Sequence, residues 1–262
     1  CFFLVKRSVG KSHRWGLIGT LDLESYDFSV DSTSLIRATE GTILSRIPPR
    51  KKIRENAPLE LPHIMVLIND EKRTLIEPFT NQLDKLTKVY DTQLMENGGQ
   101  LEGYLINSEE SFMQIASALE ALYNNLDKKN PLLFAMGDGN HSLATAKSCW
   151  EDIKQGLSDE EIKNHPARFA LVEIENIHDE GLEFEPIHRV LFNLEKDAFD
   201  QLLSNHCSSY EITEFKSNDE LKNAIEEVEG QTFGLATQKD GLLLYKLNTP
   251  DAAISAGTIQ LI

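Results

Sequence analysis

Short apolar runs separated by turn-forming residues occupy the first part of the sequence. Residues 4–5 and 15–20 are predicted to pair as a hairpin around a Val-Gly-Lys-Ser turn. Residues 64–68 and 74–77 are predicted to form a second hairpin around Asn-Asp. The intervening residues 45–62 carry four prolines and many charges. They are therefore predicted to form an ordered loop.

Helical spacing replaces this pattern in the middle of the chain. Apolar residues between 109 and 126 recur every three or four positions, which predicts an amphipathic helix. A continuous apolar run at 132–136 has the length of a buried strand, and residues 143–157 then carry one apolar helical face. Ser158 followed by Glu161 is the pattern of a capping box, so a further helix is expected there.

The remaining elements alternate irregularly between strands and helices. They are strands at 101–106 and 169–174, acidic helices at 196–203 and 219–228, and a last hairpin of 233–237 with 242–247. Such an order, without repeated βαβ units, predicts the α+β class with mixed, largely antiparallel sheets and packed helices. An acidic linker near 176–185 predicts a main domain at 1–175 and a smaller α+β part at 186–262, with one continuous domain as the alternative.

Composition narrows the classes of function. The formal net charge of −16 disfavours DNA binding, because only the stretch RIPPRKKIR is basic. The three cysteines are scattered and odd in number, which favours a reducing, cytoplasmic location. Neither a membrane-spanning apolar run nor a signal-peptide pattern is present, so no membrane association is predicted. The chain begins at Cys1 and ends on an apolar run, which suggests a fragment of a longer protein.

The turn between the strand at 132–136 and the next helix is the first candidate site. It reads Gly137-Asp138-Gly139-Asn140-His141-Ser142. Glycines let the backbone approach a ligand closely, and unpaired N–H groups at a helix start attract anions. Asp138 and His141 could then coordinate a cation, accept a proton or bind phosphate. The alternative interpretation is a simple turn in which Asn140 or Ser142 caps the helix.

An arginine-bearing segment is the second candidate site. Arg37, Arg46 and Arg50 could bind phosphate oxygens, and two prolines stiffen the loop between them. Glu40 is a candidate general base, and Thr42 is a candidate hydroxyl donor. The alternative is a solvated basic loop on an acidic protein.

A third segment contributes His188 and Arg189, which follow a proline and could converge on the same site. The other histidines show no spacing typical of a shared metal ion, so the metal content is left open. The HExxH, GxSxG and Walker motifs are all absent from the sequence, which disfavours zinc proteases, α/β-hydrolases and P-loop proteins.

Three separated blocks, RATEGTILSRIPPR, GDGNHSLATAK and FEPIHRVLF, resemble the bacterial domain-of-unknown-function family numbered 1015 over residues 1–262. Members commonly show Asp-Gly-His-His-Arg where this chain has Asp-Gly-Asn-His-Ser, so Asn140 and Ser142 depart from the pattern. That block is similar to the turn of ParB-type nucleotide-binding domains and of related free serine kinases. The resemblance therefore implies a ParB-like nucleotide-binding element.

This resemblance implies a phosphotransferase that uses ATP or another nucleotide with Mg²⁺ and acts on a small hydroxylated metabolite, for example an amino acid. Glu40, Asp138 and His141 would be its catalytic residues. The alternatives are a nucleotide-binding switch without catalysis and a structural protein with a degenerate site. The predicted phosphate-binding and nucleotide-binding residues are Arg37, Thr42, Arg46, Arg50, Gly139, Asn140, Ser142, His188 and Arg189.

Overall fold

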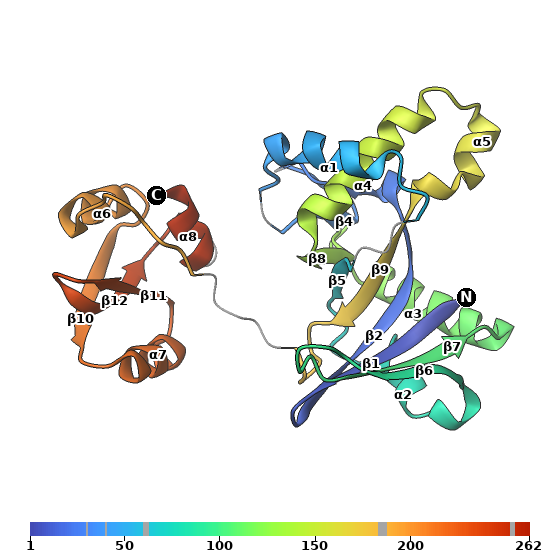
Figure 1. Cartoon of the computed structure of the whole chain (residues 1–262), viewed down its shortest axis with the longest axis horizontal. Helices are drawn as coiled ribbons and strands as arrows, with labels where there is room; N and C mark the ends of the chain where they lie inside the picture. Colours follow the sequence, from blue (N-terminus) through green and yellow to red (C-terminus); the bar gives the residue numbers. More distant parts are fainter. Residues whose placement is uncertain (30, 40, 60–62, 183–187, 252–254) are drawn as a thin grey trace. The chain divides into compact units, whose positions relative to one another are not determined.

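The chain folds into two compact units, Cys1–Glu183 and Phe184–Ile262, which are described separately below (Figure 1). The computed structural model describes residues 1–29, 31–39, 41–59, 63–182, 188–251 and 255–262. We call the two parts the first unit and the second unit. Every candidate residue of the turn and of the arginine-bearing segment belongs to the first unit, whereas His188 and Arg189 belong to the second.

A single mixed sheet organises the first unit. Among the described residues it contains nine strands in the order β3-β4-β8-β5-β9-β2-β1-β7-β6. Most neighbours are antiparallel, and the pairs β3/β4, β4/β8 and β5/β9 are parallel. The predicted α+β class with a largely antiparallel sheet is therefore confirmed. The strands are β1 (Phe2–Val9), β2 (Ser12–Asp22), β3 (Tyr26–Asp27), β4 (Ile36–Arg37), β5 (Met65–Ile68), β6 (Thr87–Gln93), β7 (Gln100–Ile106), β8 (Phe134–Asp138) and β9 (Phe169–Asn176).

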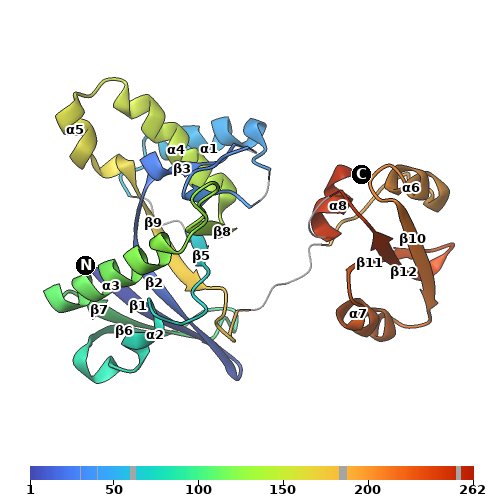
Figure 2. The ribbon, with the colours of Figure 1, turned by 180° about the vertical axis from the view of Figure 1, so that it is seen from behind.

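Helix α3 crosses one face of this sheet, behind the strands in Figure 1 and in front of them in Figure 2. The predicted helices around residues 109–126 and 143–157 are confirmed, and Ser158 and Glu161 form the predicted capping box. No helix in the described ranges combines the length and apolar character needed to cross a bilayer. The helices are α1 (Ile47–Arg54), α2 (Glu77–Thr80), α3 (Glu109–Asn124), α4 (Asn140–Lys154) and α5 (Asp159–Asn164).

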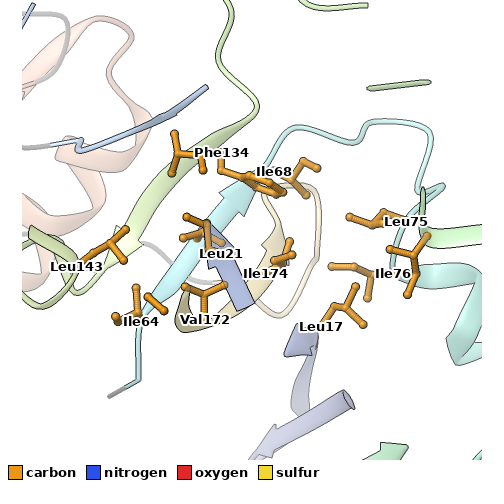
Figure 3. Close-up of a cluster of buried hydrophobic side chains, with 14 of the residues drawn as sticks. Leu17, Leu21, Ile64, Ile68, Leu75, Ile76, Phe134, Leu143, Val172 and Ile174 are labelled. Carbon is orange, nitrogen blue, oxygen red and sulfur yellow. The ribbon is translucent and has the colours of Figure 1, made fainter. Parts of the chain in front are cut away.

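The main core lies between the sheet and its helices, and Figure 3 shows part of it. Val172 and Ile174 of β9 point into this core beside Leu17 of β2. Side chains alternate between the two faces of a strand, so Glu173 and Glu175 lie on the opposite face of β9. Both glutamates are nevertheless buried. Core packing thus fixes one face of β9 and thereby determines where its two carboxylates lie.

The predicted hairpin of residues 64–68 with 74–77 is wrong in its second half. Strand β5 forms, but β8 pairs with one of its edges and β9 with the other. The following segment therefore has no free edge of β5 to join. Instead, the carboxylate of Asp70 accepts hydrogen bonds from Thr74 N at 2.5 Å and from Leu75 N at 2.8 Å, which closes a turn.

The predicted loop at 45–62 is also wrong, because α1 forms within it. Pro48 and Pro49 fall in the first turn of this helix, where the missing N–H groups have no partner in the helix anyway. Ile47 is buried, and Lys51 ion-pairs with Asp152 of α4. Helix α1 consequently packs beside α4, as Figure 1 shows.

The second unit has its own sheet and core. Its described residues form a three-stranded antiparallel sheet in the order β10-β12-β11, and the predicted last hairpin and both acidic helices are confirmed. Phe199 packs against Tyr245, whose hydroxyl donates to Asp200 at 2.6 Å. The elements are α6 (Lys196–Leu203), β10 (Ser209–Phe215), α7 (Asn218–Glu227), β11 (Gln231–Thr237), β12 (Gly241–Asn248) and α8 (Ser255–Leu261).

Candidate functional site

The turn between β8 and α4 is built on two glycines. Gly139 has a φ of +85° and occupies the N-cap position of α4 without a capping side chain. Its N–H donates to Asp138 Oδ1 at 2.6 Å. The pairing of β8 with β5 is irregular at this point, because Met65 pairs with Asp138 whereas Val66 pairs with Met136. Gly137 is therefore an extra residue in a bulge that places the exposed Asp138 opposite Met65.

The start of α4 fits an anion. The helix is fifteen residues long, and glycine leaves its first N–H groups without a side-chain acceptor at the cap. Such a helix end combines hydrogen-bond donors with the positive end of the helix dipole. This geometry supports the anion-binding interpretation of the turn over the interpretation in which Asn140 or Ser142 is the cap.

Asn140 has a structural task. Its side chain is buried, its Oδ1 accepts from Thr39 N at 3.2 Å, and its Nδ2 donates to Thr39 Oγ1 at 3.4 Å. Thr39 Oγ1 in turn donates to the carbonyl of Met136 at 2.7 Å. These bonds attach the segment after β4 to the turn. The Asn140 amide therefore holds the two candidate segments together.

His141 contacts the segment that contains Thr42 and Ile43. Ile43 N donates to His141 Nε2 at 3.2 Å, so Nε2 carries the lone pair and the neutral ring keeps its proton on Nδ1. The hydroxyl oxygen of Thr42 is buried, and no described residue provides it with a hydrogen-bond partner. A buried hydroxyl beside a helix start is suited to contact a bound anion.

The predicted phosphate-binding arginines differ in their surroundings. Arg37 donates to the carbonyl oxygens of Ser32 and Pro131, at 3.1 and 3.0 Å, and to Asn130 Oδ1 at 2.6 Å. Its guanidinium therefore connects the loop at Ser32 to the loop at residues 130–131 through hydrogen bonds. Arg46 and Arg50 are exposed at the start of α1, and Arg50 Nη1 donates to the carbonyl of Arg46 at 3.1 Å.

Helix α1 brings positive charge toward the turn. Arg54 Nη1 donates to the carbonyl of Ser142 at 3.5 Å, and Lys51 Nζ lies 3.4 Å from the carbonyl of Ser148. Ser142 is a predicted residue of the site, and its sequence position suggests no direct partner. The tertiary structure shows that its carbonyl connects the turn to α1.

Three predicted residues cannot be placed beside the turn. Glu40 lies outside the described residues. His188 and Arg189 belong to the second unit and are exposed there. Arg189 Nη2 donates to Gln260 Oε1 at 3.0 Å and to the carbonyl of Ala256 at 3.3 Å, so it contacts α8 of its own unit.

A histidine–carboxylate pair that sequence analysis did not single out lies beside the turn. His63 Nε2 is 2.6 Å from Glu173 Oε2, and the two side chains are 51% and 7% exposed. The hydrogen bond to Glu173 raises the pKa of His63 above its ordinary value. The sequence signal was the strand FALVEIEN, in which two glutamates alternate with apolar residues of a buried strand.

Glu175 and Arg14 extend this pair along β9 and β2. Arg14 Nε lies 2.8 Å from Glu175 Oε1, and the Glu175 side chain is 1% exposed. Burial, together with the neighbouring Glu173 carboxylate, raises the pKa of Glu175 to about 7 despite the cation of Arg14. The sheet thus keeps two carboxylates next to each other on its second face.

Comparison with known proteins identifies the family. Residues 1–260 match a family described as a protein of unknown function, DUF1015. The chain belongs to the DUF1015 family. No curated protein and no solved structure gives a significant match. The family was already expected from three sequence blocks, which include the turn and the arginine-bearing segment of this DUF1015 member.

The cavities of this DUF1015 member set limits on how a ligand can lie. A cavity of about 190 Å³ borders the candidate segment and is lined partly by Ser29, Ser32, Arg37 and Thr39. A larger cleft of about 680 Å³ in the same unit is lined by Trp15 and Glu77 among others and includes no residue of the turn. The smaller cavity adjoins the turn through Thr39, which hydrogen-bonds to Asn140, although no residue of the turn itself lines it.

Metal binding has no preformed site in the described part of the chain. No group of three or more His, Cys, Asp and Glu side chains lies close enough there to hold an ion. A divalent cation at the turn would therefore need ligands from a bound phosphate group as well as from the protein.

Proposed function

We propose that this DUF1015 member binds the phosphate groups of a nucleotide at the start of α4 and transfers a phosphoryl group to a small hydroxylated metabolite. The observation that carries the proposal is the glycine-capped start of a fifteen-residue helix directly after a strand. The hydroxyl of Thr42, which is buried and has no hydrogen-bond partner among the described residues, is a second indication of a ligand.

Phosphoryl transfer requires positioned reactants and neutralised charge more than covalent chemistry by the protein. The N–H groups of α4 would hold one phosphate group, and the exposed Arg46 and Arg50 would neutralise another. Mg²⁺ would arrive with the nucleotide as part of the substrate. Asp138 is exposed at the end of β8, and the half-buried His141 lies in the first turn of α4, so both belong to the surroundings of the proposed phosphate site.

The resemblance of the turn sequence to ParB-type domains and free serine kinases supports the proposal of a nucleotide rather than a simple anion. It also supports a second candidate function, a nucleotide-binding switch without catalysis. The hydrogen bonds between Asn140 and Thr39 favour this second candidate, because they couple the turn to the segment that follows β4. A bound phosphate at the turn would then change the position of that segment.

A thermal-shift panel of nucleotides with and without Mg²⁺ tests the binding step. Binding to the folded state adds about 2.7 kcal/mol of stability at a hundredfold excess of ligand over Kd. We expect at least one nucleotide to raise the Tm of the wild-type chain. The double variant Arg46→Ala/Arg50→Ala should lose most of this increase, whereas Lys239→Ala, an exposed lysine of the second unit, should retain it.

Turnover separates the two candidate functions. Loss of a phosphate-stabilising group typically lowers a rate by about 10²-fold or more. His141→Ala should therefore reduce nucleotide consumption in the presence of a pool of hydroxylated metabolites by at least that factor. Binding without consumption in the wild type would leave only the switch. If no nucleotide raises the wild-type Tm, both candidates are wrong.

A further inference from the structure

His63 lies at the edge of the proposed phosphate site. It precedes β5, and a Cβ atom placed on Gly139 would lie 3.3 Å from Ile64 Cα and 3.6 Å from the carbonyl oxygen of His63. The first residue of β5, Met65, pairs with Asp138 on one side and with Glu173 on the other. The row Glu173–Met65–Asp138 therefore runs directly across three neighbouring strands, β9, β5 and β8.

The geometry of the pair fixes the protonation pattern of the ring. A carboxylate accepts, so His63 Nε2 donates its proton to Glu173 Oε2 across 2.6 Å. In the neutral imidazole the lone pair is then on Nδ1. The His63 side chain is half exposed, whereas that of Glu173 is almost fully buried. The buried carboxylate thus orients the ring through a hydrogen bond at Nε2, while part of the ring stays exposed to solvent.

Gly16 provides the space that this arrangement needs. A Cβ atom at this position of β2 would overlap the carboxylate of Glu173. The second oxygen of that carboxylate, Oε1, is buried without a hydrogen-bond partner among the described residues. Since no described residue donates to Oε1, Glu173 depends on the hydrogen bond that His63 makes to Oε2.

Four other titratable or charged groups surround the pair. Glu175 on β9 favours the charged imidazole, and Arg14 on β2 opposes it. Tyr90 on β6 lies near Glu173, and burial together with that carboxylate raises its pKa. Asp138 on β8 is in the same row of the sheet. The hydrogen bond from His63 to Glu173 has the largest effect and raises the pKa of His63.

We propose that His63 is the general base of the phosphoryl transfer and that Glu173 positions it. This inference rests on the proposed function. As the acceptor oxygen forms its bond to the γ-phosphorus of a nucleoside triphosphate, its proton moves to Nδ1 of His63. The bond from that phosphorus to the bridging oxygen breaks, and the nucleoside diphosphate leaves with the electron pair. His63 then releases its proton to solvent through its exposed side.

Kinetics across pH provide the first test, with MgATP and the best metabolite from the panel. His63→Gln should lower kcat by about 10²–10⁴-fold, the usual range for a general base. His206→Gln is a matched control, because His206 is also paired with a carboxylate, that of Asp251, in the second unit. It should change kcat less than twofold. Glu40→Gln tests the base predicted from the sequence.

Glu173→Gln distinguishes positioning from a purely structural role. A base must be deprotonated, so kcat/KM rises with pH through the pKa of His63. The pKa of His63 is raised by Glu173, so the amide should move this rise to lower pH. The same downward shift should appear in the histidine NMR titration of the ligand-free protein, in the resonance that His63→Gln removes.

Failure of this inference is distinguishable from failure of the proposed function. A wild-type chain that binds no nucleotide overturns both. An active wild type whose kcat survives His63→Gln, with an unchanged Tm, overturns the role of His63 alone. An unshifted kcat/KM profile in Glu173→Gln overturns the positioning role of Glu173, and loss of activity in Glu40→Gln with an active His63→Gln returns the base to Glu40.

Discussion

Among the described residues, two histidine–carboxylate pairs lie in different environments. His63 and Glu173 are 2.6 Å apart, and the Glu173 side chain is 7% exposed. His206 and Asp251 are 3.2 Å apart, and the Asp251 side chain is 58% exposed. The first carboxylate is on a central strand of the first unit, whereas the second is in a surface segment of the second unit.

The difference shows why residue type alone does not determine how strongly a histidine and a carboxylate interact. Water solvates an exposed carboxylate, so its ion pair with a histidine contributes little to the stability of the folded protein. A buried carboxylate has lost that water and depends on its remaining partners. The sheet imposes this dependence on Glu173, because the core residues Val172 and Ile174 on either side fix the face on which it lies.

Gly16→Ala is expected to change the stability of the first unit more than any other substitution considered for the two pairs. The added methyl group overlaps the Glu173 carboxylate, and overpacking typically costs about 1–3 kcal/mol. Urea unfolding followed by tryptophan fluorescence reports on the first unit, because Trp15 and Trp150 both lie there. Gly156→Ala is the control, since its nearest neighbour would be Ile153 O at 3.9 Å. Equal stability of the two variants would contradict the position of Glu173.

Glu175→Gln is expected to have the next largest effect on the free energy of unfolding, and it should stabilise the protein where Gly16→Ala destabilises it. The unfolded carboxyl group ionises near 4.5, whereas burial raises the folded pKa to about 7. The folded state therefore binds more protons between these values, and its stability falls as pH rises through them. Glutamine removes this loss, so the variant should be more stable than wild type by about 1–2 kcal/mol at pH 8.5.

At pH 4, below both pKa values, this advantage should disappear. Urea unfolding at the two pH values checks the prediction. Glu120→Gln, on the exposed side of α3, should show no such pH-dependent gain. An advantage of Glu175→Gln that is the same at both pH values would rule out ionisation as its cause.

Double-mutant cycles on the two histidine pairs should give the smallest differences. We expect a coupling of about 1 kcal/mol for His63 and Glu173 at pH 6, after allowing for the half-exposed ring, and less than about 0.5 kcal/mol for His206 and Asp251. Glu173 raises the folded pKa of His63, so its contribution is fully present below the unfolded value of 6.5 and is lost as pH rises through the folded value.

Calorimetric unfolding at pH 6 and pH 9 measures the two double-mutant cycles, one in the first unit and the other in the second unit. The His63–Glu173 coupling should be smaller at pH 9. Similar coupling energies for the two pairs at pH 6 would show that burial of the carboxylate has no energetic consequence here.

Local patterns predicted much of the fold. Helix α3 was predictable because its apolar positions follow helical spacing, and α5 because Ser158 and Glu161 form a capping box. Strand β6 was not predicted, because most of its side chains are exposed and it forms by pairing with the edge of β7. Helix α1 was missed because its prolines were interpreted as breakers, although they fall where a helix tolerates them.

The candidate site was only partly predictable for a similar reason. The glycines of the turn indicated a close backbone approach, and Gly139 does adopt a positive φ. Phosphate binding by Arg37 stays a prediction, and its hydrogen bonds to three groups of neighbouring loops were not predictable from the sequence. The strand FALVEIEN could have indicated Glu173, but no local pattern indicated His63, because the two residues are 110 positions apart in sequence.

The sequence by itself determined the class of the fold, most of its helices and strands, and the family, because periodicity, caps and motif blocks are local properties. Only the tertiary structure decided which polar groups meet. The parallel pairing of β5 with β9 places Glu173 beside the chain that enters β5, and the bulge at Gly137 places Asp138 opposite Met65. Strand order and register depend on how every strand buries its apolar face at once, so no segment encodes them alone.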